Sequence, residues 1–282
     1  KEYQQLACGD MGLGFVGIAN VLSPRWWRSK KAAKRIREIM DPMVRDRYRR
    51  HQAGEPDTHQ DILSALFAAR SPDTGEPMNF EYHELVEQIA MLFLAGHETS
   101  AAALSWCLYL MAATPHFQER VHAEAVGQFG GRPIEPQDVK ALSFCRDVFR
   151  ETLRLYPSVP FLARDATRAE TMRDKTIAPG DTLLLSPWLS HRNERNWDKP
   201  QVFDPDRYSR SETQKSVQEA YFPFSAGPRV CLGASFAMQE AVLVLSNIFK
   251  RFRLEAVSGE VPTPVAQLTL RSTNGIKVRI FR

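Results

Sequence analysis

The sequence predicts a mainly α-helical fold with small β-sheets, and three observations support this class. Apolar residues recur at helical spacing through most of the first half and again over residues 234–249. Short β-like runs bounded by Pro and Gly turns are confined to residues 159–186 and the last twenty residues. The 282 residues, 43% of them hydrophobic, suffice for a sizeable core in one or two domains.

Residues 24–50 are strongly basic and predict an amphipathic helix with a charged outer face. Its apolar positions are Ile36, Ile39, Met40, Met43 and Val44. Such a basic face could meet nucleic acid or a membrane surface, but a solvated helix face is the favoured interpretation because charge runs are common on surface helices. A short helix is expected over residues 61–69, followed by a Pro/Gly loop over 71–78.

A long helix is expected from residue 79 to about 114, where it would cross roughly 50 Å at 1.5 Å per residue. Its middle is apolar on most faces, so we expect it to be central and buried. Pro115 ends or bends it, a further helix covers 116–129, and a cap-and-helix pattern covers 135–155.

The second half alternates between strands and irregular segments. Short strands are expected within 159–186, and the polar, Pro-containing stretch 193–213 is expected to be irregular. At the C-terminus, β-like segments at 266–270 and 276–280 flank Asn274-Gly275, which predicts a hairpin with its turn at that dipeptide.

Bulk properties exclude several classes of protein. The four cysteines are widely spaced, which favours a reducing compartment over a disulfide scaffold. A net charge of +4 does not by itself imply nucleic acid as a partner. No apolar run is long enough to span a bilayer, so we expect a soluble, cytoplasmic chain. The chain opens on Lys1, which indicates a fragment and leaves an upstream anchor open.

One cysteine lies in a glycine-bounded loop directly before the apolar helix at 234–249. The positive end of the helix dipole favours the thiolate of Cys231, which could then be a metal ligand or a nucleophile. The glycines let a flat partner approach the backbone, and an arginine two residues earlier offers a cation for an acidic group. The simpler alternative is a buried core cysteine, which suits a cysteine with no surrounding pattern.

The surrounding pattern decides between these alternatives. The segment resembles the haem-binding loop of the cytochrome P-450 family, Phe-x-x-Gly-x-Arg-x-Cys-x-Gly. The fixed positions are met at Phe224, Gly227, Arg229, Cys231 and Gly233. The resemblance implies haem b (iron protoporphyrin IX) as cofactor, with Cys231 as the ligand to its iron.

The long helix contains a second motif, Ala95-Gly96-His97-Glu98-Thr99. Polar groups interrupt an apolar stretch here, and burying them without partners costs a few kcal/mol. The alternative is that Glu98 and Thr99 face solvent. The resemblance implies the distal oxygen-binding groove at Gly96, and makes Glu98 and Thr99 the acid–alcohol pair that relays protons.

Glu151 and Arg154 lie one helical turn apart, on the same face. Alone the pair is weak evidence, because most such pairs are exposed and contribute under about 1 kcal/mol. The resemblance makes Arg207 their partner in a buried triad that holds the Cys231 loop. Asp206 and Tyr208 depart mildly from the residues that the family commonly has there.

The resemblance also implies which residues contact the haem propionates and which line the substrate cavity. It places Arg164 and Arg229 on the two haem propionates, with a surface strand arginine as the alternative for Arg164. Residues 159–163 and 267–270 would line the substrate cavity, and their apolar character favours a hydrophobic small molecule.

The resemblance covers residues 25–282 and lacks the family's N-terminal part. We therefore expect one domain over 1–282, with partner-facing helices in 1–78 and the haem-binding core in 79–282. The implied function is a haem-thiolate monooxygenase that receives electrons from an external ferredoxin or flavoprotein and has no nucleic-acid partner. The sequence leaves the oligomeric state open. A peroxide-driven enzyme is disfavoured by the Glu98-Thr99 pair. A truncated, non-catalytic chain that acts only as a binding protein is the alternative from another class.

Overall fold

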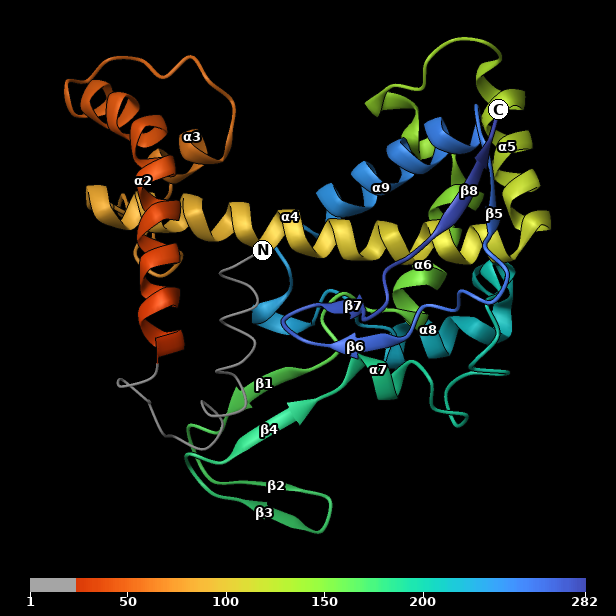
Figure 1. Cartoon of the computed structure of the whole chain (residues 1–282). Helices are drawn as coiled ribbons and strands as arrows, with labels where there is room; N and C mark the ends of the chain where they lie inside the picture. Colours follow the sequence, from red (N-terminus) through yellow and green to blue (C-terminus); the bar gives the residue numbers. More distant parts are fainter. Residues whose placement is uncertain (1–23) are drawn as a thin grey trace. The chain divides into compact units, whose positions relative to one another are not determined.

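The computed structural model describes residues 24–282, and these form helices with small β-sheets, as predicted (Figure 1). The α-helices are α2 (Pro24–Gln52), α3 (Ile62–Phe67), α4 (Tyr82–Ala113), α5 (Pro115–Phe129), α6 (Ser143–Leu155), α7 (Pro187–Ser190), α8 (Gln214–Ala220) and α9 (Ala234–Phe249). Short 3-10 helices are η1 (Pro136–Ala141), η2 (Pro205–Ser209), η3 (Ser211–Thr213) and η4 (Gly227–Arg229). The backbone divides into two compact units within α4, one up to His97 and one from Glu98 to Arg282.

The strands of the described part pair two by two, and every pair is antiparallel. These strands are β1 (Leu162–Asp165), β2 (Glu170–Met172), β3 (Lys175–Ile177), β4 (Thr182–Leu185), β5 (Arg253–Ala256), β6 (Pro264–Ala266), β7 (Leu270–Ser272) and β8 (Val278–Phe281). The pairs are β1 with β4, β2 with β3, β5 with β8 and β6 with β7.

The predicted C-terminal hairpin about Asn274-Gly275 is wrong. β7 pairs with β6 across the turn at 267–269, and β8 pairs with β5. The Asn274 side chain accepts a hydrogen bond from the Thr263 amide (3.0 Å) and donates to the Val261 carbonyl (3.0 Å). These bonds tie the segment after β7 to the segment before β6, so the dipeptide links two strand pairs instead of closing one.

The first unit has its own small core, made by α2, α3 and the first half of α4. Its buried side chains are Met40, Val44, Leu63, Leu85, Val86 and Ala90. Asp61 caps α3 by accepting from the Ser64 amide at 3.0 Å, which explains why that helix begins at residue 62. The helices predicted over 24–50 and 61–69 are therefore present as α2 and α3. The partner-facing role predicted for residues 1–78 stays a prediction, and residues 1–23 lie outside the described residues.

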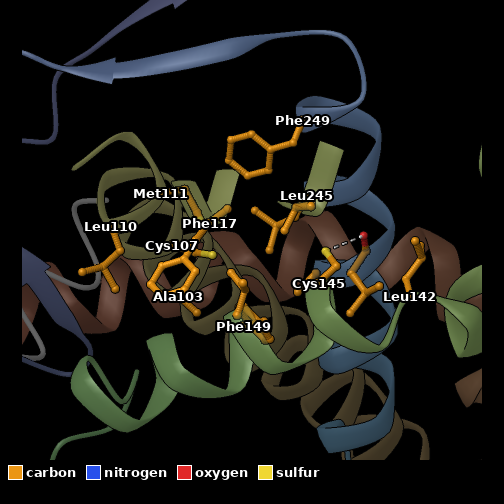
Figure 2. Close-up of a cluster of buried hydrophobic side chains, with 14 of the residues drawn as sticks. Ala103, Cys107, Leu110, Met111, Phe117, Leu142, Cys145, Phe149, Leu245 and Phe249 are labelled. Carbon is orange, nitrogen blue, oxygen red and sulfur yellow. Dashed lines mark hydrogen bonds between the residues drawn. The ribbon is translucent and has the colours of Figure 1, made fainter. Parts of the chain in front are cut away.

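The core of the second unit lies among the second half of α4 and α5, α6 and α9 (Figure 2). Cys107 of α4 and Cys145 of α6 are fully buried in it. Burial raises the pKa of the Cys107 thiol to about 12 and raises that of Cys145. These two cysteines are ordinary core residues, whereas Cys231 is exposed.

The segment predicted as one cap-and-helix pattern over 135–155 is divided in two. Residues 136–141 form η1 and residues 143–155 form α6. Glu124 of α5 accepts from the Phe144 amide (2.8 Å) and the Cys145 amide (2.9 Å). This carboxylate satisfies free N–H groups in the first turn of α6, which fixes where that helix begins.

Candidate active site

The loop from Phe224 to Gly233 is closed by its own backbone. The Cys231 amide donates to the Phe224 carbonyl at 2.8 Å, and the Val230 amide donates to the Gly227 carbonyl at 3.0 Å. Ser225 (φ 65°) and Gly227 (φ 68°) adopt left-handed backbone, which the loop needs in order to turn. Phe224 is partly buried and packs on the core, so the loop is anchored at its start. The result is a preformed loop with its cysteine at the surface.

Exposed apolar side chains flank Cys231 in the sequence. Val230 is 57% exposed, Leu232 84% and Phe236, in the first turn of α9, 70%. A Cβ at Gly233 would lie 3.9 Å from the Cys231 sulfur, which is ordinary contact. An exposed thiol can bind a soft metal ion, and apolar side chains near it in the sequence suit a metal held by an apolar carrier.

Two arginines lie at the loop. Arg164 on β1 donates from Nη2 to the Ser225 hydroxyl at 3.1 Å and from Nη1 to the Ala163 carbonyl at 2.7 Å. It is therefore directed at the cysteine loop from another element. Arg229 is exposed on η4, two residues before Cys231. Both guanidinium groups are suited to bind a carboxylate.

The motif on α4 is divided between buried and exposed positions. Gly96 is exposed, Thr99 is half-buried and Glu98 is only 6% exposed. The Glu98 carboxylate accepts from the Thr269 hydroxyl at 2.8 Å and forms an ion pair with Arg271 of β7. Glu98 therefore has partners inside the protein and does not face solvent.

Three neighbouring residues of α4 bind three different elements. After Glu98, the Thr99 carbonyl accepts from the Ser158 hydroxyl at 2.9 Å. The Ser100 hydroxyl then donates to the Glu240 carboxylate of α9, also at 2.9 Å. The turn that contains the predicted acid–alcohol pair is thus bonded to three segments that lie far from it in the sequence.

The structure brings Glu151, Arg154 and Arg207 together in a buried ion network. Glu151 and Arg154 have no solvent exposure, and Arg207 is 2% exposed. The Glu151 carboxylate accepts from Arg154 (2.8 and 2.9 Å) and from Arg207 Nε (2.9 Å). Arg154 also donates to the carbonyls of His191 and Pro200, both at 2.7 Å, so α6 is bonded to the segment after α7.

His191 connects this network to the cysteine loop. Its Nδ1 lies 3.2 Å from the Arg154 carbonyl, and its Nε2 accepts from the Phe222 amide at 3.0 Å. Burial lowers the pKa of His191 to about 3, so the ring is neutral, with the proton on Nδ1. The network and the segment that precedes Phe224 are therefore joined through one imidazole.

Sequence reasoning missed His191, Thr269, Arg271 and Glu240. Each belongs to a segment distant in sequence from the residue it bonds, and none forms a local motif with it. The one available signal was the position of Thr269, within the segment 267–270 expected to line the substrate cavity.

Comparison with known proteins decides the family. The cytochrome P450 family model matches residues 11–279. The chain belongs to the cytochrome P450 family. It is 34% identical to cyclooctatin synthase of Streptomyces melanosporofaciens over 243 residues, covering 86% of this chain and 52% of that protein. It is 33% identical to human cytochrome P450 4X1 over 273 residues, covering 92% and 52% of the two chains.

A further relative and a solved structure agree. Cyclooctat-9-en-7-ol 5-monooxygenase of Streptomyces melanosporofaciens is 35% identical over 233 residues, covering 82% of this chain and 49% of that protein. A crystal structure of cytochrome P450 CYP102L1 matches with a TM-score of 0.78 and 26% identity, covering 93% of this chain and 58% of that one. The chain thus spans about half the length of the curated relatives it matches, and it has the P450 fold over that span. None of the described helices has both the length and the apolar character needed to cross a bilayer.

Proposed function

We propose that this P450 chain acts as the haem-thiolate part of a monooxygenase, with Cys231 as the ligand to haem iron. The observation that supports this proposal most strongly is the exposed Cys231 thiol on a closed loop, which also has exposed apolar side chains, contains Arg229 and binds Arg164 through Ser225. The other described cysteines are buried in the core and could not reach a cofactor.

The residues present fit a haem of the b type. Leu232, Phe236 and Val230 are exposed apolar side chains that a flat macrocycle would cover. Arg164, held at the loop by Ser225, and Arg229 are the side chains that would bind its two propionates. A haem without covalent attachment needs a ligand, an apolar cover and cations for its carboxylates, and this loop offers all three. When bound, the haem would supply the iron that activates dioxygen.

The remaining candidate residues would then transfer protons or hold the Cys231 loop in place. Thr99 would hold and pass protons at its hydroxyl, and Glu98 would be the acid of the pair. Glu151, Arg154 and Arg207, with His191, would keep the segment before Phe224 in place. Gly96, which has no side chain, would leave room beside α4 for dioxygen.

The substrate we propose is an apolar organic molecule, and the electron donor is an external ferredoxin or flavoprotein reductase. Segments 159–163 and 267–270 offer exposed apolar side chains, including Phe161 (42%) and Leu268 (44%). One relative, cyclooctat-9-en-7-ol 5-monooxygenase, acts by its name on cyclooctat-9-en-7-ol, which supports an organic small molecule as the substrate class.

The test is the absorption spectrum of the reduced protein under carbon monoxide, after purification and haem reconstitution. Thiolate-ligated haem should give a strongly red-shifted Soret band, Cys231→Ser should lose it, and Cys107→Ala should keep it. A panel of apolar compounds added to the oxidised protein should then identify ligands by difference spectra. A chain that takes up no haem at all would contradict the proposal and favour the non-catalytic binding protein, for which the half-length span is the supporting observation.

A further inference from the structure

The hairpin formed by β6 and β7 is bonded to α4 and to the segment between α6 and β1. The Trp106 indole N–H donates to the Leu270 carbonyl at 2.9 Å, and the Leu270 amide donates to the Ser158 carbonyl at 2.9 Å. One residue on either side, the Thr269 hydroxyl and the Arg271 guanidinium both engage Glu98. Three consecutive residues, 269 to 271, therefore hold the start of β7 in place.

Among these bonds, the one between Arg271 and Glu98 joins two full charges. The Glu98 side chain is 8% exposed and that of Arg271 is 32% exposed, so the pair is partly shielded from water. Both Nε and Nη2 of Arg271 are directed at the same carboxylate oxygen, Oε1. Other ion pairs of the same region, such as Lys277 with Glu260, are far more exposed, at 59% and 39%. Solvent screens those pairs strongly and this pair much less.

Glu98 precedes Thr99 in the sequence, and Thr269 belongs to the turn at 267–269 that forms the tip of the hairpin. The tip contains Leu268, 44% exposed, and is tightened by a bond from the Gln267 amide to the Thr269 carbonyl at 3.1 Å. The Arg271 guanidinium thus fixes both the position of the Glu98 carboxylate and the position of the hairpin tip.

We propose that Arg271 is a positioning residue of the active site, which clamps Glu98 and the β6–β7 tip to each other. This inference rests on the proposed function, because the tip and Glu98 matter to catalysis only if the site is that of a monooxygenase. Removing the Arg271 charge takes this ion pair away from a carboxylate that is almost fully buried, which is costly. The carboxylate and the tip then both move from the places that the pair had fixed.

The first test needs no cofactor. Hydrogen exchange of the full chain should show protection at residues 268–271 falling by roughly tenfold or more in Arg271→Gln, and largely restored in Arg271→Lys. In thermal unfolding, Arg271→Gln combined with Glu98→Gln should lower the midpoint by clearly less than the sum of the two single changes, because both remove the same interaction. Lys277→Gln is the matched control and should leave exchange at 268–271 unchanged.

The second test uses the haem-loaded protein and 1-phenylimidazole as a probe of the site. Arg271→Gln should weaken its binding by roughly tenfold, and Arg271→Lys should restore it to within about threefold of wild type. Additive midpoints together with unchanged exchange and probe affinity in Arg271→Gln would overturn the inference. If the wild type gives no carbon-monoxide band, the proposed function fails, whereas a wild type with the band and unaffected variants refutes the clamp alone.

Discussion

At the scale of single residues, His191 is the side chain whose ionisation bears most directly on stability. Burial lowers its pKa from an ordinary 6.5 to about 3, so the imidazole ring is neutral in the native state. The stabilisation that this gives is fully present above pH 6.5 and is lost as the pH falls from 6.5 toward 3, because only the unfolded chain can take up the proton there.

We therefore expect the free energy of unfolding to fall by about 1.6 kcal/mol between pH 6.5 and pH 5 from His191 alone, because the slope rises from half of about 1.4 kcal/mol per pH unit at pH 6.5 toward that full value. Urea unfolding at the two pH values measures it. His191→Gln should be less stable than wild type at pH 7 and should lose less between the two. An equal loss in wild type and variant would contradict the assignment.

The buried side chain of Gln118 on α5 gives a second prediction at this scale, on stability. Its side chain, 3% exposed, donates to the carbonyls of Met111 (3.1 Å) and Leu254 (2.9 Å) and accepts from the Leu254 amide (2.6 Å). Gln118→Met keeps the volume but removes all three of these bonds inside the core, and each buried group that is left unpaired costs about 1–3 kcal/mol. We expect a loss of about 3 kcal/mol or more by urea unfolding, whereas Gln239→Met, at an exposed position on α9, should change stability by under about 0.5 kcal/mol.

At the scale of elements, the ion network joins α6 to η2 and to the segment after α7. Glu151→Gln removes the charge that two buried guanidinium groups share, so we expect a loss of about 3–5 kcal/mol in unfolding free energy. Asp206→Asn breaks the exposed Arg120–Asp206 pair between α5 and η2 and should cost under about 1 kcal/mol. Similar losses in the two variants would show that Glu151 is not the centre of the network.

Elements with strong local signals were predictable from the sequence, and those that depend on distant partners were not. The start of α9 at Ala234 and its end at Phe249 follow from a glycine-bounded loop and an uninterrupted apolar period. The pairing of β8 with β5 depends on residues more than twenty positions apart, so the nearby Asn-Gly dipeptide suggested the wrong partner. In the same way the Cys231 loop and the Glu151–Arg154 pair are local motifs, whereas the partners of Glu98 lie over 170 residues away.

At the scale of the whole chain, the cysteines should differ sharply in reactivity. Cys231 is exposed, whereas Cys107 and Cys145 are fully buried and burial raises the pKa of both thiols. Iodoacetamide should alkylate Cys231 in the native chain and reach the other two only after unfolding, as measured by peptide mass spectrometry. Haem loading should then protect Cys231. Rapid alkylation of Cys107 or Cys145 in the native chain would contradict the described core.

The backbone bonds within the Cys231 loop have a kinetic consequence. Because the Cys231 and Val230 amides are already bonded inside the loop, folding of the chain has fixed these residues beforehand. Fixing one residue's backbone opposes association by about 1–2 kcal/mol when it must happen during binding. A macrocycle arriving at this loop meets a surface that needs little rearrangement, so its rate of capture should depend mainly on diffusion and on how freely the thiol can be reached.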